Sequence, residues 1–125
     1  MTNLNAIKSI KDVVSEKEWD ARCQLAALYR LIAHFRMTDL IDTHISLRVP
    51  DADGHFLINQ YGIPFEKMTA SHLVKIDYAG HTVADYDQGK LVNTAGFVIH
   101  SAIHDARQDV HCVIHTHTVD GIAVS

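Results

Sequence analysis

Two histidines near the end of the chain, His115 and His117, are the residues best suited to chemistry. They close an apolar run, residues 110–117, whose composition is typical of a β-strand. Side chains at positions i and i+2 of a strand point to the same side, with their Cα atoms roughly 7 Å apart. Both imidazoles can therefore reach one metal ion, and zinc is a metal that imidazole binds well.

The same pair also has a plainer interpretation, as a surface or hydrogen-bonded pair of histidines. The metal hypothesis is favoured by position, since the pair lies between an apolar strand and the start of a helix, where the active sites of layered sheets gather. Two ligands do not hold a metal tightly, so a third group is required. His111 faces the same side, but four residues along a strand is about 13 Å, which is too far from His115.

His100 and His104 are spaced one helical turn apart and share a side of a predicted helix. No glutamate accompanies them as in the His-Glu-X-X-His zinc motif. Helical histidines beside an apolar stripe usually make hydrogen bonds, so we keep only His100, as a group that supports the ligands or lines the pocket.

The elements that must position these residues follow from hydrophobic periodicity. A helix is predicted from Ser15, with Glu18 completing a capping box, to about Met37. A second helix is predicted over 95–107. The apolar faces expected to be buried are Ala21, Leu25, Leu28, Ile32 and Phe35 on the first helix, and Ile99, Ala102, Ile103 and Ala106 on the second.

Strands are predicted over 44–49 and 55–59 as one hairpin, and over 73–77 and 81–84 as another. The strand at 110–117 follows, and 119–125 resembles the first turns of a further helix. Residues 1–14 are predicted to be a mobile arm, and residues 15–125 a single domain of the α/β class, with helices around antiparallel hairpins.

Composition excludes several classes of protein. The chain has 125 residues and a net charge of −4 without a basic cluster, which argues against a nucleic-acid partner. No apolar run approaches the length of a membrane span. The two cysteines, Cys23 and Cys112, form no Cys-X-X-Cys motif, so a reduced, cytoplasmic setting is expected.

With these elements placed, the sequence from about Glu18 onward resembles the class II aldolase/adducin N-terminal family. The matching segments occur in the family's order and are specific as a series. They are Asp42–Arg48, Phe56–Asn59 leading to Gly62, Leu73–Asp77 with Gly80, Ala95–His100, and His115-Thr116-His117.

The resemblance implies a three-layer α/β/α fold with a mainly antiparallel central sheet, commonly assembled as a homotetramer. It implies a divalent metal, zinc with Mn²⁺ as the alternative, held by His115, His117 and a third histidine that would lie beyond Ser125. Such a metal polarises a carbonyl during C–C bond cleavage of a small-molecule substrate. The expected substrate-binding residues are His44, Ser46, Asn59, Gly62, Asn93 and Thr94.

The chain departs from the aldolase pattern at three places. The family's catalytic acid, aligned on His100, is replaced by Gly96, and residues 90–104 contain no Asp or Glu. Two residues of the expected phosphate loops are altered, to His44 and Tyr61. The chain also ends in a predicted first helical turn without a stop signal, as in a fold that is incomplete at its C-terminus.

Two functions follow from this pattern. The first is a metal-dependent lyase acting by aldol cleavage, decarboxylation or related enediolate chemistry, in which His44, His100 or Tyr61 replaces the missing acid. The second is an adducin-like module that binds partners without catalysis, or an inactive fragment.

Overall fold

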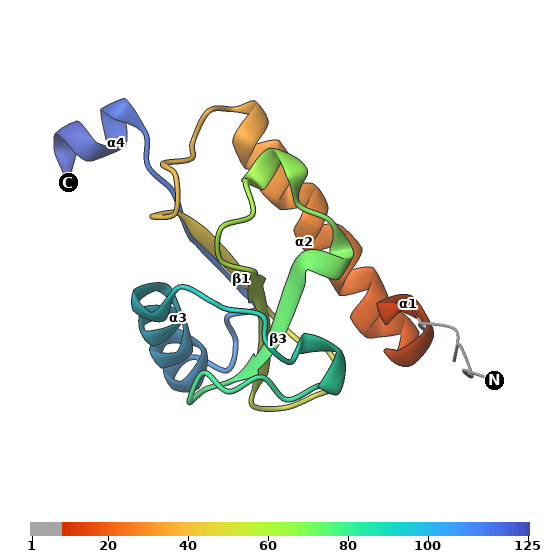
Figure 1. Cartoon of the computed structure of the whole chain (residues 1–125). Helices are drawn as coiled ribbons and strands as arrows, with labels where there is room; N and C mark the ends of the chain where they lie inside the picture. The colour runs from red at the N-terminus through yellow and green to blue at the C-terminus, as the bar shows by residue number, and fades with distance from the viewer. Residues whose placement is uncertain (1–8) are drawn as a thin grey trace.

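In the computed structural model, which describes residues 9–125, a four-stranded sheet separates two helical layers (Figure 1). The strands are β1 (His44–Arg48), β2 (His55–Asn59), β3 (Leu73–Asp77) and β4 (Cys112–His115). Their spatial order is β3-β2-β1-β4, and every neighbouring pair is antiparallel. Helix α2 (Glu16–His34) covers one face and α3 (Thr94–Ala106) covers the other. The three-layer α/β/α arrangement with an antiparallel sheet is confirmed.

The remaining elements are short. They are the helices α1 (Ile10–Val13) and α4 (Val119–Val124) and the 3-10 turns η1 (Phe65–Lys67), η2 (Ala70–His72) and η3 (Asp85–Asp87). Helix α1 lies within the segment predicted to be a mobile arm, of which residues 1–8 are outside the described part. Helix α4 projects away from the sheet, and none of its residues is buried (Figure 1).

Helix α2 begins as the sequence predicts but uses its capping glutamate differently. The Ser15 hydroxyl accepts a hydrogen bond from the backbone N–H of Glu18. The Glu18 carboxylate does not return to the cap: it pairs instead with Arg22 and Lys75. The helix ends at His34, three residues before the expected end, and the predicted core residue Phe35 is 61% exposed.

One apolar cluster fills the space between α2 and the sheet. It contains Ala21, Leu25, Tyr29 and Ile32 of the helix with Ile45 and Leu57 of the strands. The Tyr29 hydroxyl accepts hydrogen bonds from the backbone N–H groups of Ile45 and Asn59, at 2.9 and 3.1 Å. These bonds bring α2 against the start of β1, the strand on which the candidate site begins.

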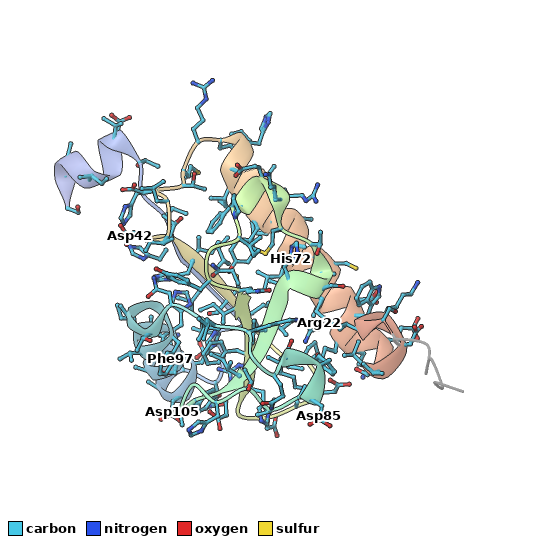
Figure 2. The ribbon with its side chains drawn as sticks, viewed as in Figure 1. Arg22, Asp42, His72, Asp85, Phe97 and Asp105 are labelled. Atoms are coloured by element: carbon cyan, nitrogen blue, oxygen red, sulfur yellow. The ribbon has the colours of Figure 1, made fainter. Side chains whose placement is uncertain are left out.

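A buried ionic group joins α2 to β3 and η3. Arg22 is fully buried, with its guanidinium 2.9 Å from Glu18 and 3.7 Å from Asp87. Asp87, also fully buried, binds Lys90 at 2.8 Å and accepts a hydrogen bond from the Lys75 backbone. Figure 2 shows Arg22 between the helix and the strand. The segment 85–90, which is polar in sequence, therefore supplies a buried charge.

Helix α3 packs with the opposite face from the one predicted. Its buried residues are Gly96, His100, Ser101 and His104, whereas Ile99 is 56% exposed and Ala102 and Ala106 are also exposed. The apolar face was expected to point inward because burial of polar side chains is costly without partners. Here β1 supplies those partners, so the prediction was wrong.

The two ends of α3 are tied to the rest of the domain. Asn93 caps the first turn by accepting from Gly96 N at 3.1 Å, and its amide donates to the Ile41 carbonyl. At the other end, the Arg48 guanidinium donates to the carbonyls of His104 and Arg107 at 2.7 and 3.1 Å. A cation is favourable where the carbonyls of a helix end are unpaired.

One predicted strand is absent from the structure and another is shorter than expected. Residues 81–84 form no strand, and only an isolated bridge joins Thr82 to Ile76, because the chain leaves the edge of the sheet to place Asp87 in the interior. The last strand covers Cys112–His115 rather than 110–117. His117 therefore lies just beyond the strand.

Candidate metal centre

The two predicted ligands lie together at one end of the sheet. His115 is the last residue of β4, directly opposite His44, the first residue of β1. The ring centroids of His115 and His117 are 4.9 Å apart, and their Nε2 atoms are 3.2 Å apart. Two nitrogens bound to a tetrahedral zinc ion at about 2.05 Å would be about 3.3 Å apart. The two side chains thus already have the separation of a ligand pair.

His117 is held by the loop that joins α2 to β1. Its backbone N–H donates to the Met37 carbonyl at 3.0 Å, and its Nδ1 lies 2.9 Å from Asp39 Oδ2. An ionised carboxylate can only accept, so Nδ1 carries the proton and Nε2 keeps its lone pair. Leu40, next in the chain, has a left-handed backbone (φ 47°), which is uncommon for a non-glycine residue.

The other ligand, His115, is held from the inside of the fold. Its Nδ1 lies 3.2 Å from Nε2 of His44, which leaves the Nε2 of His115 facing His117. The Nδ1 atom of His117 thus contacts a carboxylate, and the Nδ1 atom of His115 contacts an imidazole. Histidines that bind a metal through Nε2 typically have such a hydrogen-bond partner at Nδ1.

A line of hydrogen bonds continues from His44 into the interior. His44 Nδ1 lies 2.7 Å from His100 Nε2, and His100 Nδ1 lies 2.5 Å from the hydroxyl of Ser46. That hydroxyl lies 2.8 Å from His104 Nε2. We call His44, His100, Ser46 and His104 the histidine relay. All four residues are buried, and they join β1 to the inner face of α3.

The histidine relay is electrically neutral near pH 7. Burial is the main cause that lowers the pKa of each ring, to about 4 for His44, about 3 for His100 and about 4 for His104. Neighbouring histidines lower the pKa of His44 and His100 further, and the Arg48 guanidinium lowers that of His104. Each ring therefore has one N–H donor and one acceptor nitrogen.

Gly96 makes room for the first ring of the histidine relay. A Cβ at this position would lie 2.7 Å from Cδ2 and 2.8 Å from Nε2 of His44. Both distances are shorter than a non-bonded contact of a Cβ atom allows. The space that a side chain at position 96 would occupy is thus filled by the His44 imidazole, which comes from a different element.

The predicted substrate-binding residues fall into two groups. Asn59 and Gly62, with Tyr61, line a pocket of about 360 Å³ whose opposite wall is formed by residues 38, 40 and 41 beside Asp39. Ser46 is fully buried within the histidine relay. Asn93 caps α3, and Thr94 is exposed at the start of that helix.

Sequence reasoning missed three residues of this site. Asp39 lay outside every motif, Arg48 ended a family segment without being given a role, and His104 was set aside as a hydrogen-bonded helical residue. The alternation of His44, Ser46 and Arg48 along one strand face was a usable signal, because those three side chains all face α3. Within residues 9–125, no group of three His, Cys, Asp or Glu side chains could hold a metal ion by itself.

Comparison with known proteins agrees with this arrangement of strands and helices. Residues 23–125 match the family described as the class II aldolase and adducin N-terminal domain. The chain belongs to the class II aldolase and adducin family. Within residues 9–125, no helix is long and apolar enough to cross a membrane.

Both branches of the aldolase and adducin family are represented among the relatives. An aldolase II superfamily protein from Pseudomonas syringae has 56% identity and a TM-score of 0.86, over 92% of this chain and 45% of that one. L-fuculose 1-phosphate aldolase from Glaciozyma antarctica has 35% identity and a TM-score of 0.79, over 86% of this chain and 43% of that one. Alpha-adducin of Rattus norvegicus is 41% identical over all of this chain and 17% of its own length.

The chain spans about half the length of its bacterial relatives. It covers 45% of a Caulobacter vibrioides protein to which it is 52% identical over 117 residues.

Proposed function

We propose that this chain supplies two metal ligands and one wall of the substrate pocket to a divalent-metal-dependent lyase. The observation that carries the proposal is the relation between His115 and His117. Their Nε2 atoms face each other at 3.2 Å while their Nδ1 atoms are engaged by His44 and Asp39. Zinc, or Mn²⁺ in its place, fits this donor set. Two imidazole lone pairs facing each other repel, and a cation between them removes that repulsion.

A bound divalent metal would act as a Lewis acid toward a substrate carbonyl, which is the chemistry that aldol cleavage and decarboxylation require. The residues of this chain would hold the metal, orient its ligands and bind the substrate. His115 and His117 fix the position of the metal, and Asp39 and His44 fix the orientation of those two rings. The pocket beside Asp39 receives a small oxygenated substrate, with the Asn59 side chain and the Gly62 backbone on its wall.

Of the three groups expected to replace the missing acid, Tyr61 is the one that the contacts leave free. Both ring nitrogens of His44 and both of His100 are engaged within the fold. Tyr61 is 42% exposed on the pocket wall, and its hydroxyl makes no hydrogen bond with the described residues. We assign proton transfer at the substrate oxygen to this phenol, which can both donate and accept.

A non-catalytic, adducin-like role is the second candidate. It is favoured by Gly96, since the segment 90–104 carries no carboxylate and the space at position 96 is filled by His44. Against it stands the intact His115–His117 pair with its two outer partners, which a pure binding module does not need.

Assembly into a homo-oligomer, a tetramer by family resemblance, belongs to the same proposal. The outer face of α3 leaves Val98 and Ile99 more than half exposed, and α4 exposes Val119, Ile122 and Val124. Exposed apolar side chains of this kind are typical of surfaces that pack against other parts of an assembly. Light scattering of the purified whole protein checks the subunit number.

Metal analysis of the whole protein separates the two functions. We expect bound zinc in the purified protein, and we expect His115→Ala and His117→Ala to lose it while His34→Ala, an exposed histidine of α2, keeps it. The metal-loaded protein is then tested for aldehyde or CO₂ release from small hydroxy-carbonyl and keto-acid compounds. Tyr61→Phe should lose activity but not metal. Absence of metal from the wild-type protein, with melting unchanged by a chelator, would reject the lyase.

A further inference from the structure

The hydrogen bonds that lead from His115 through the histidine relay all use their ring atoms in the same order. Each link runs from an Nδ1 atom nearer the metal pair to an acceptor deeper in the fold: His115 to His44, His44 to His100, and His100 to Ser46. The Ser46 hydroxyl then reaches Nε2 of His104. Because each ring has one proton, protonation of Nδ1 at any one histidine fixes the same tautomer at all the others.

Two arrangements of protons satisfy these contacts. In the inward arrangement each histidine donates through Nδ1, so Nε2 of His115 has a free lone pair. In the outward arrangement each histidine donates through Nε2, so that His115 donates to Nε2 of His117 and cannot bind a metal there. The number of protons is the same in both, one on each ring and one on the Ser46 hydroxyl.

The buried end of the relay favours the inward arrangement. His104 is fully buried, and its Nδ1 makes no hydrogen bond of standard geometry with the described residues. The backbone carbonyl of Val110 favours a proton on this ring, and Nε2 of the ring is already engaged by Ser46. A carbonyl can accept a proton but cannot donate one, so it stabilises Nδ1–H and not an Nδ1 lone pair. The outward arrangement would leave a buried acceptor facing another acceptor, which is costly.

We propose that His44, His100, Ser46 and His104 select the metal-binding tautomer of His115, so that the interior of the domain sets the metal affinity of a ligand at its surface. These are positioning residues, since only His44 touches a ligand. The inference rests on the proposed metal site. It goes beyond that site because the relay extends from β1 into α3, to a residue that no metal would touch.

Ser46→Ala is the most informative variant. It removes the hydroxyl that connects His100 to His104, at a small change in volume and three hydrogen bonds away from His115. Ser101→Ala is the matched control, since Ser101 is a buried serine within α3 whose hydroxyl donates only to the Val98 carbonyl. Loss of an outer partner of a metal ligand typically weakens metal binding by about 10- to 100-fold.

The experiment has two readouts on the whole protein. Zinc titration by calorimetry should give about tenfold or greater weakening for Ser46→Ala and an unchanged Kd for Ser101→Ala, with folding of both checked by circular dichroism. In the wild type without added metal, ¹⁵N spectra of the imidazoles should show protonated Nδ1 and unprotonated Nε2 on His44, His100 and His104. This second readout needs no variant, so a failure of Ser46→Ala to fold leaves the proposal testable.

The outcomes distinguish the relay from the metal site itself. Zinc binding by wild type that is lost in His115→Ala but unchanged in Ser46→Ala would overturn the relay and leave the metal site intact. Protonated Nε2 atoms on the relay histidines of the metal-free protein would do the same. If the wild type binds no zinc, the proposed function fails, and the relay as a selector of metal affinity fails with it.

Discussion

The imidazole of His44 lies where a side chain on Gly96 would have to be, with 2.7 Å between its Cδ2 and the Cβ of an alanine at that position. The two residues come from β1 and from the first turn of α3. Their fit explains why a helix that binds the sheet through its polar face can approach β1 so closely. A side chain larger than glycine at position 96 therefore requires a side chain smaller than histidine at position 44.

A double-mutant cycle tests this dependence. Alanine is a better helix former than glycine by about 1 kcal/mol, while overpacking of a rigid contact costs about 1–3 kcal/mol. We expect Gly96→Ala alone to lower the free energy of unfolding by about 1–2 kcal/mol. In a His44→Ala background the clash is absent, so the same change should become neutral or stabilising. Urea denaturation of the four proteins measures the coupling, and simple additivity would contradict the steric argument.

Asp39 is expected to act on the metal only through His117. Asp39→Asn keeps the size of the side chain but removes the charge that holds the His117 Nδ1 proton at 2.9 Å. Because the two groups are partly exposed, we expect little change in melting temperature, but about tenfold weaker zinc binding. Asp42→Asn, in the same loop, is the control and should keep wild-type affinity. Equal Kd values for the two variants would show that Asp39 does not support the ligand.

The buried ionic group around Arg22 should dominate the stability of the α2 layer. Asp87→Asn leaves the Lys90 ammonium without its carboxylate partner and Arg22 with Glu18 alone, and broken buried pairs cost about 3–5 kcal/mol. The exposed pair Arg107–Asp109 is a control with a similar N–O distance, 2.7 Å. Surface pairs contribute about 0–1 kcal/mol, so Asp109→Asn should change the midpoint of urea unfolding very little. Similar losses for both variants would contradict this difference.

Acid should destabilise the domain through its buried histidines. The folded-state pKa of His100 is lowered to about 3 and that of His104 to about 4, whereas the unfolded chain has the ordinary value of 6.5. The unfolded state therefore binds more protons below pH 6.5, so stability is complete above that pH and falls as the pH drops toward 4. One independent ring would lose about 2 kcal/mol between pH 6.5 and pH 5.

Urea midpoints measured at pH 7.5, 6.5, 5.5 and 5.0 without added metal check this slope. The decrease should be shallower in His104→Asn, whose amide remains neutral at every pH used. A stability that stays level or rises between pH 6.5 and pH 5 would mean that these rings are protonated in the folded protein.

The sequence predicted most of the architecture because its hydrophobic pattern is strong where one layer packs on another. The first helix, the hairpin of β1 and β2, and the pairing of His115 with His117 all follow from periods of 3.6 or 2 residues. The inward face of α3 did not follow, because a rule based on apolar residues cannot foresee a buried polar face that meets its partners on β1. Asp39 and Asp87 were missed for a related reason: each binds a group that is distant in sequence.

The two sides of β1 should differ in how freely their residues can be replaced. Ile45 and Leu47 meet α2 in an apolar cluster, where side chains of similar volume can substitute for one another at small cost. His44 and Ser46 meet α3 through directed hydrogen bonds, so a replacement of either leaves two neighbours without a partner. A scan of all substitutions along this strand should therefore alternate between tolerant and intolerant positions. Related sequences should then vary freely at every second residue of the strand while holding the residues between them constant.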